Sequence, residues 1–166
     1  GERQRAGCIK ALRELERKKH IVLPRTGTRG GKRSPRRLVG GVAEAKEVPC
    51  DVSEIRELRV IKVETQEQMR IWNELMIQGH PRGAGPLVGR QLYYLVKSEH
   101  GWLGGVGFSS SALHLEARDR WIGWDWDKRR ASLHHVVNMS RFLIRPGVSC
   151  KNIEYRSLGM AVREFP

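Results

Sequence analysis

The stretch HPRGAGPLVGRQLYYLVKSEHGWLGGVGF, residues 80–108, decides the fold. Its first part, residues 80–91, is a loop rich in glycine and proline. Two apolar runs follow, 92–96 and 102–108, on either side of the turn Ser-Glu-His-Gly at 98–101. Aromatic and β-branched residues on either side of a short turn are typical of an antiparallel hairpin. A glycine-rich loop at the edge of such a hairpin is a place where a rigid sheet can carry a site.

The second apolar run contains three glycines, Gly104, Gly105 and Gly107. Glycine inside a strand weakens the strand and often marks a bulge or a position where another group approaches the backbone closely. The sequence therefore predicts a bulge in this strand, or a close approach of its backbone to a ligand.

A strand and a helix are predicted before the hairpin. The strand covers 58–63, and the helix begins at Thr65, because Thr65 and Gln68 have the spacing of a capping box. Apolar residues then recur at helical spacing and should bury one face of the helix, which ends at Gly79: Met69, Trp72, Leu75 and Met76.

Four further elements are predicted after the hairpin. They are a short helix over 110–117, a helix from Asp125 to His135 with Asp127 as its N-cap, a strand over 140–146 and a helix over 153–164. In the last helix we expect Ile153, Leu158 and Val162 to be buried. The complete order, β-α-β-β-(α insert)-β-α, predicts an α+β fold with a mixed or antiparallel sheet.

Positive charge is concentrated in the first third of the chain. The 166 residues carry a formal net charge of +13. Residues 1–47 hold 14 Lys/Arg against 5 Asp/Glu, whereas residues 48–166 hold 17 against 13. An excess of this kind indicates a polyanionic partner, nucleic acid first, although a solvated basic tail has the same composition.

The basic region divides into two parts ahead of a folded domain over 48–166. Residues 2–18 have helical apolar spacing, and residues 19–24 have a short strand pattern that ends at a proline. Together they predict a partial winged-helix-like segment over 1–24, although a lone helix and strand are common. Residues 25–47 predict a basic flexible linker, which could also bind phosphates as an arm.

Several classes of protein are disfavoured. The three cysteines, Cys8, Cys50 and Cys150, are far apart and form no C-x-x-C pair, so neither a disulfide framework nor a metal site is expected. A reducing cytoplasm fits this usage. No apolar run approaches the roughly 18 residues of a membrane helix, so we expect no membrane partner.

The glycine loop contains the first group of candidate site residues. His80, Arg82 and Arg90 flank it and could bind a phosphate or polarise a carbonyl group, while Gly83 and Gly85 admit close approach. His80 and Arg90 are the candidates for a catalytic role. The alternative is an ordinary surface loop followed by an arginine at a strand end.

A second group lies between the hairpin and the last strand. It interleaves tryptophans with arginines and includes Arg118, Arg120, Trp121, Trp124 and Arg129. Stacking on unpaired bases beside phosphate contacts uses this mixture. The alternative is a pair of core tryptophans with salt-bridged surface charges. Carboxylates nearby could hold a metal or act as acid and base, although capping and pairing with arginine also explain them: Glu116, Asp119, Asp125 and Asp127.

Five blocks of sequence resemble a known family. They are IWNELM (71–76), GPLVGRQL (85–92), GWLGGVGFS (101–109), ARDRWIGWD (117–125) and SRFLI (140–144). In this order they are similar to the Druantia anti-phage system protein DruA family, which is bacterial and is also met beside transposase domains. The resemblance covers 1–166 in outline and 69–152 strongly. It implies a DNA-associated protein of phage defence or of a mobile element, with other defence-system or transposase proteins as partners. It also adds Arg141 to the binding candidates, and its winged-helix-like leader resembles residues 8–24.

The order of elements also resembles the first part of the GNAT acetyltransferase fold. That resemblance implies acyl-coenzyme A at the strand-to-helix junction, where Lys151 and Asn152 would hold the pyrophosphate at a helix start. The Arg/Gln-x-x-Gly-x-Gly/Ala pattern usual there is missing, and the following strands would lie beyond residue 166, so the domain is expected to be truncated. The alternative functions are therefore an acyl-CoA-dependent acyltransferase acting on a nucleotide or base, or a non-catalytic scaffold subunit of a defence complex.

Overall fold

The computed structural model describes residues 11–12, 14–22 and 35–165 and divides the chain into two compact units, 1–34 and 35–166. In the first unit, residues 11–12 and 14–17 are helical, which agrees with the predicted helix over 2–18 where it is described. The strand predicted over 19–24 is wrong where it is described, because residues 18–20 form a turn and residues 21–22 belong to no strand. Its last two residues and the following stretch, 25–34, lie outside the described residues.

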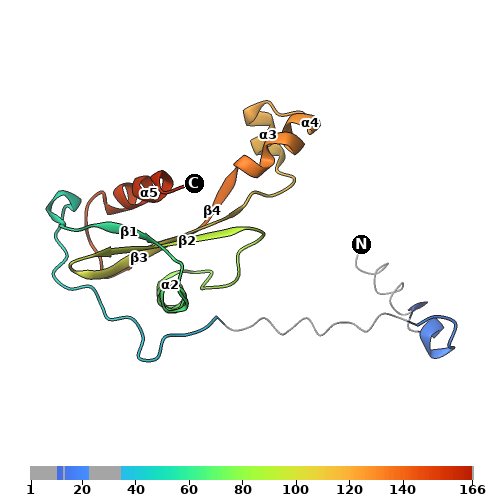
Figure 1. Ribbon diagram of the computed structural model, residues 1–166, viewed down its shortest axis with the longest axis horizontal. Coiled ribbons are helices and arrows are strands. Elements are labelled where there is room, and N and C mark those ends of the chain that lie inside the picture. The colour runs from blue at the N-terminus through green and yellow to red at the C-terminus, as the bar shows by residue number, and fades with distance from the viewer. Residues whose placement is uncertain (1–10, 13, 23–34, 166) are drawn as a thin grey trace. The chain divides into compact units, whose positions relative to one another are not determined.

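The second unit is built on one antiparallel sheet of four strands in the order β1-β2-β3-β4 (Figure 1). The strands are β1 (Arg59–Lys62), β2 (Gln91–Ser98), β3 (Gly101–Ser110) and β4 (Val137–Ile144). The predicted hairpin is confirmed, with β2 and β3 closing at the pair Ser98 and Gly101. Since every pairing is antiparallel, the sheet is not mixed.

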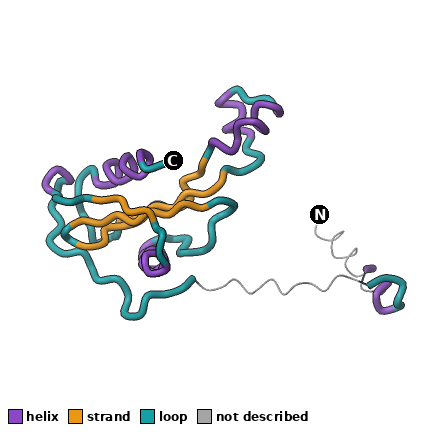
Figure 2. Tube along the Cα trace, in the orientation of Figure 1, coloured by secondary structure: helices purple, strands orange, loops and turns teal. Residues whose placement is uncertain are grey.

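One long helix covers each face of the sheet: α2 (Gln66–Gly79) on one and α5 (Ile153–Arg163) on the other (Figures 1 and 2). Side chains alternate along β2, so that Leu95 packs in the cluster under α2, whereas Tyr94 and Val96 pack in the clusters on the α5 side. The capping box at Thr65 and Gln68 is confirmed and starts α2 as predicted.

The stripe that α5 buries agrees with the predicted one at Ile153, and in part at Leu158, which packs half-buried against the core. Ile153, Ser157 and Ala161 are buried, whereas Val162 is 49% exposed. The buried residues are separated by four positions, which keeps them on one side of the helix, and a position nine residues after Ile153 is rotated by about 180°. The prediction for Val162 was therefore wrong.

The glycines of β3 allow close packing within the protein. A Cβ atom on Gly104 would lie 2.0 Å from the carbonyl oxygen of Leu143, and one on Gly105 would lie 3.1 Å from the ring of Trp72. The predicted bulge is present, since the register between β3 and β4 shifts at Gly107 and Phe108. The groups that approach these glycines belong to β4, to α2 and, at Gly107, to Leu87 as well.

Residues 35–47, predicted as the end of a flexible linker, pack against the domain. Leu38 and Val42 contact the cluster under α2. The buried Arg145 donates hydrogen bonds to the carbonyl oxygens of Val42 and Ala43. The compact unit thus begins at Pro35 rather than at Val48.

A helical excursion, residues 111–136, separates β3 from β4; we call it the helical arm. It contains α3 (Glu116–Ile122), α4 (Trp126–Ser132) and the 3₁₀ turn η2 (Leu133–His135), and it lies beyond the ends of the two strands (Figure 1). A second 3₁₀ turn, η1 (Val52–Glu54), precedes β1.

Local predictions in the helical arm were displaced by a few residues. Of the helix predicted over 110–117, Ser110 ends β3, residues 111–115 form a loop, and α3 begins only at Glu116. The N-cap of α4 is Asp125 rather than Asp127, because the carboxylate of Asp125 accepts the Lys128 N–H at 2.8 Å. Strand β4 begins at Val137, before the predicted 140, because residues 137–139 pair with the end of β3.

Candidate nucleic-acid interface

The glycine loop, residues 80–90, joins α2 to β2 and is anchored at both ends. His80 is the C-cap of α2, and its Nδ1 accepts the backbone N–H of Arg82 at 3.1 Å. Ala84 and Leu87 are buried and fix the middle of the loop. Gly83 has a φ of +54°, a backbone conformation that residues other than glycine rarely adopt.

Arg141 on β4 reaches this loop, although it is 58 residues away from Gly83 in the sequence. Its Nε donates to the carbonyl oxygen of Gly83 at 3.1 Å, and its Nη1 donates to the carbonyl oxygen of Ser140 at 2.8 Å. Its Nη2 donates to no group within the described residues. The structure therefore brings together four of the predicted residues: His80, Arg82, Gly83 and Arg141.

Positive charge on the loop is not balanced by carboxylates. Arg82, Arg90 and Arg141 form no ion pair with any residue that the structure describes. Burial, followed by the charges of Arg141 and Arg82, lowers the pKa of His80. The corner made by these side chains is thus electropositive even with His80 neutral.

Arg90 lies at the other end of the loop. Its N–H donates to the Oγ of Ser110 at 2.8 Å, and its carbonyl oxygen accepts the Ser110 N–H at 2.9 Å. Because Ser110 is the last residue of β3, the exposed Arg90 sits where the helical arm begins. Within the described residues, Arg90 and His80 share no hydrogen bond, so the two candidates for catalysis are not joined.

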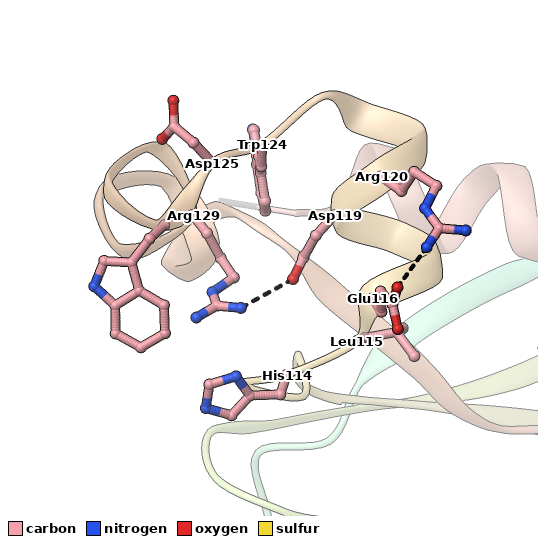
Figure 3. A pocket seen from close by; sticks show the side chains of 9 residues that line it. His114, Leu115, Glu116, Asp119, Arg120, Trp124, Asp125 and Arg129 are labelled. Carbon is pink, nitrogen blue, oxygen red and sulfur yellow. Dashed lines mark hydrogen bonds and ion pairs between the residues drawn. The ribbon is translucent and has the colours of Figure 1, made fainter.

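In the helical arm, the predicted arginines gather around a carboxylate. Asp119 is buried and accepts hydrogen bonds from Arg118 at 2.6 and 2.8 Å. It also accepts one from Arg129 at 3.2 Å, which Figure 3 shows as a dashed line. Burial alone would raise the pKa of Asp119, but the two arginines outweigh it and hold that pKa below its usual value. Of the predicted carboxylates, Asp119 and Glu116 pair with arginines and Asp125 caps α4.

Two other cations of the arm are also paired. Arg120 forms an ion pair with Glu116, as the dashed line in Figure 3 marks, and Lys128 pairs with Asp125 at 3.3 Å. The arm therefore offers fewer free cations for phosphate than the sequence pattern indicated.

The tryptophans of the arm are not core residues. Trp121 is 88% exposed and Trp126 is 60% exposed. The guanidinium group of Arg129 lies 4.3 Å from the ring centre of Trp126, and that of Arg118 lies 5.7 Å from the ring centre of Trp124. An open cleft of about 380 Å³ lies between α3 and α4, lined by His114, Leu115, Glu116, Asp119, Arg120, Trp124, Asp125, Trp126 and Arg129.

Sequence reasoning missed the apolar surface around these tryptophans. Leu113, Ile122, Val137 and Met139 are exposed on or beside the helical arm. In the sequence, these apolar residues look like residues that pack into a core. They are exposed because the arm projects away from the sheet.

Lys151 and Asn152, the residues predicted to hold a cofactor, are both exposed at the start of α5. The N–H of Lys151 donates to the carbonyl oxygen of Cys50 at 2.7 Å, and its carbonyl oxygen accepts the Val52 N–H at 3.2 Å. The Asn152 side chain caps no N–H of the helix. The backbone of Lys151 is therefore occupied by the segment before β1.

No group of three or more metal-ligating side chains occurs within the described residues. Over the same part of the chain, no helix is both long and apolar enough to cross a membrane.

A family model described as Druantia protein DruA matches residues 8–166. No curated protein and no protein of solved structure shows a significant match to the chain. The comparisons thus do not confirm the resemblance to acetyltransferases or to winged helices. The family match, which spans both units, shows that the chain belongs to the family of the Druantia protein DruA, a component of an anti-phage defence system.

Proposed function

We propose that this protein is a nucleic-acid-associated component of anti-phage defence that binds an unpaired strand where the glycine loop and the helical arm meet. The observation that carries the proposal is a set of three cations on and beside the loop, Arg82, Arg90 and Arg141, that form no ion pair with any described residue. They lie at the sheet end from which the exposed tryptophans project.

The two surfaces supply different parts of such an interface. Arginines without a carboxylate partner are free to contact phosphates, and phosphate contacts give an affinity that falls steeply with salt. Trp121 is 88% exposed, so its ring is open to stacking by bases of any sequence. An unpaired strand suits both, because its bases can turn towards the arm while its phosphates follow the loop.

The experiment is a measurement of the affinity for single-stranded DNA and RNA over a series of salt concentrations. Arg90→Gln should reduce the slope of log affinity against log salt by about 0.7, the value for one phosphate contact on a single strand. The matched control is Arg156→Gln on α5, which removes the same charge from another part of the unit and should leave the slope unchanged. Trp121→Ala should weaken binding by about 1–3 kcal/mol without changing the slope. Absence of affinity for either strand at low salt would refute the proposal.

The exposed apolar residues of the arm favour a second candidate function, a scaffold subunit that docks on another protein of the defence system. The same variants separate the two functions. A scaffold loses its protein partner on Trp121→Ala, whereas Arg90→Gln leaves that partner bound.

A further inference from the structure

We propose that His80, Arg82 and Arg141 form a binding site for a phosphate dianion, such as the free phosphate at the end of a nucleic-acid strand. The choice of a strand end rests on the proposed function. The inference deepens that function by naming the chemical group that this part of the glycine loop would bind.

The geometry leaves hydrogen-bond donors of two arginines without a partner within the described residues. Arg141 is held half-buried by two carbonyl oxygens, those of Gly83 and Ser140, and its Nη2 has no partner within the described residues. Arg82 is exposed two residues after His80, and its side chain makes no hydrogen bond in the described part of the chain. Two guanidinium groups therefore flank one imidazole.

The imidazole ring of His80 supplies a third hydrogen-bond donor. Its Nδ1 accepts the Arg82 N–H, so a neutral ring carries its proton on Nε2 and can donate it. Burial lowers the pKa of this ring, and so do the charges of Arg141 and Arg82, the charged groups that act on it within the described residues.

The charge balance favours a dianion over an internal phosphodiester. Two fixed positive charges without a carboxylate match the charge of nearly −2 on a phosphomonoester at neutral pH, whereas a phosphodiester carries only one. A bound dianion would also reverse the effect of the two arginines on His80, because an opposite charge favours the protonated ring.

The first measurement is an NMR titration of His80 in the whole chain, with the signal assigned from the spectrum of His80→Gln. In buffer without phosphate we expect the pKa of His80 to lie below its ordinary value of about 6.5, and we expect inorganic phosphate to raise it. Arg82→Gln should abolish the rise. This variant removes no side-chain hydrogen bond that the structure shows, so the loop should keep its conformation.

The second measurement compares single strands of one sequence that carry a terminal phosphate or a terminal hydroxyl group. The phosphorylated strand should bind about tenfold more tightly, as expected for a charge-assisted contact. This advantage should vanish in Arg82→Gln and in Arg141→Gln and should persist in the Arg156→Gln control.

The outcomes separate the two sources of phosphate. A terminal phosphate that adds affinity identifies the strand end, whereas a rise in the pKa of His80 with inorganic phosphate alone identifies the free ion. If neither effect occurs, the site is refuted, even when unmodified strands bind with the expected salt slope. If no strand binds but phosphate still raises the pKa, the proposed function fails and the site stands.

Discussion

Glu74 is the buried charge that ties the first residues of the domain to its core. Its side chain is 2% exposed and accepts two hydrogen bonds from Arg37, at 2.6 and 2.8 Å, and one from Gln78 at 3.0 Å. The hydrogen bonds from Arg37 outweigh burial and lower the pKa of Glu74. A buried carboxylate that loses its partner destabilises a fold, because its charge is then left without water or cation.

We therefore predict that Arg37→Gln lowers the free energy of unfolding, and that the loss depends on pH. The lowered pKa of Glu74 contributes stability above the unfolded value of about 4.3, and this contribution is lost as the pH falls through the folded pKa. Urea unfolding should show a large difference from the wild type near neutral pH and a small one in acid. Adding Glu74→Gln to Arg37→Gln should restore part of the stability, and an equal loss at both pH values would contradict this account.

The effect of replacing a tryptophan on stability depends on whether its ring is buried. We predict that Trp121→Ala changes the free energy of unfolding by no more than about 0.5 kcal/mol, because its ring is exposed. Trp72→Ala should cost about 3–5 kcal/mol, because the ring of Trp72 is buried between α2 and the sheet. Urea titration of both variants also serves the binding experiments, since it shows that the Trp121 variant is folded. A large loss of stability in that variant would mean that its ring is covered.

At the scale of elements, the pairing of β3 with β4 depends on Gly104, whose lack of a side chain lets the backbone of β4 approach closely. Gly104 pairs with Ile144, and the space beside it is filled by the carbonyl group of Leu143. The sheet can bring these two strands together at this register only where one of them lacks a side chain.

We predict that Gly104→Ala destabilises the domain by about 3 kcal/mol or more, because the methyl group has no room without displacing β4. The matched control is Gly159→Ala on α5, where a Cβ atom would meet nothing within 4 Å. That change should stabilise the helix by about 0.5–1 kcal/mol. Thermal unfolding of both variants tests the comparison, and equal shifts of Tm would show that close packing at Gly104 has no role.

At the scale of the whole molecule, positive charge and the folded core are separated along the chain. Residues 1–34 hold 11 Lys/Arg against 3 Asp/Glu, and they form a compact unit distinct from 35–166. We predict that the chain shortened to 35–166 keeps its cooperative thermal unfolding but binds nucleic acid with a smaller salt slope. Calorimetry and the salt series measure the two effects. An unchanged slope would place every phosphate contact on the second unit.

The hairpin, the start of α2 and the α+β class could be predicted from the sequence because their signals are local. Residues within a few positions of one another specify a capping box at Thr65 or a turn between two apolar runs. The ends of helices and strands were predicted less well where two neighbouring positions could each serve as the end. Asp125 and Asp127 are both good N-caps, and β4 is longer than predicted because Val137 pairs with the end of β3.

The sequence by itself determined the elements, the uneven charge and the family resemblance. The tertiary structure decided which charges remain free. Asp119 pairs with Arg118 and Arg129 in the helical arm, while Arg141 crosses from β4 to a loop 58 residues away and leaves one nitrogen without a partner within the described residues. Ion pairs and hydrogen bonds between distant segments depend on where the sheet and its connections place each backbone, and periodicity in a sequence carries no information about that placement.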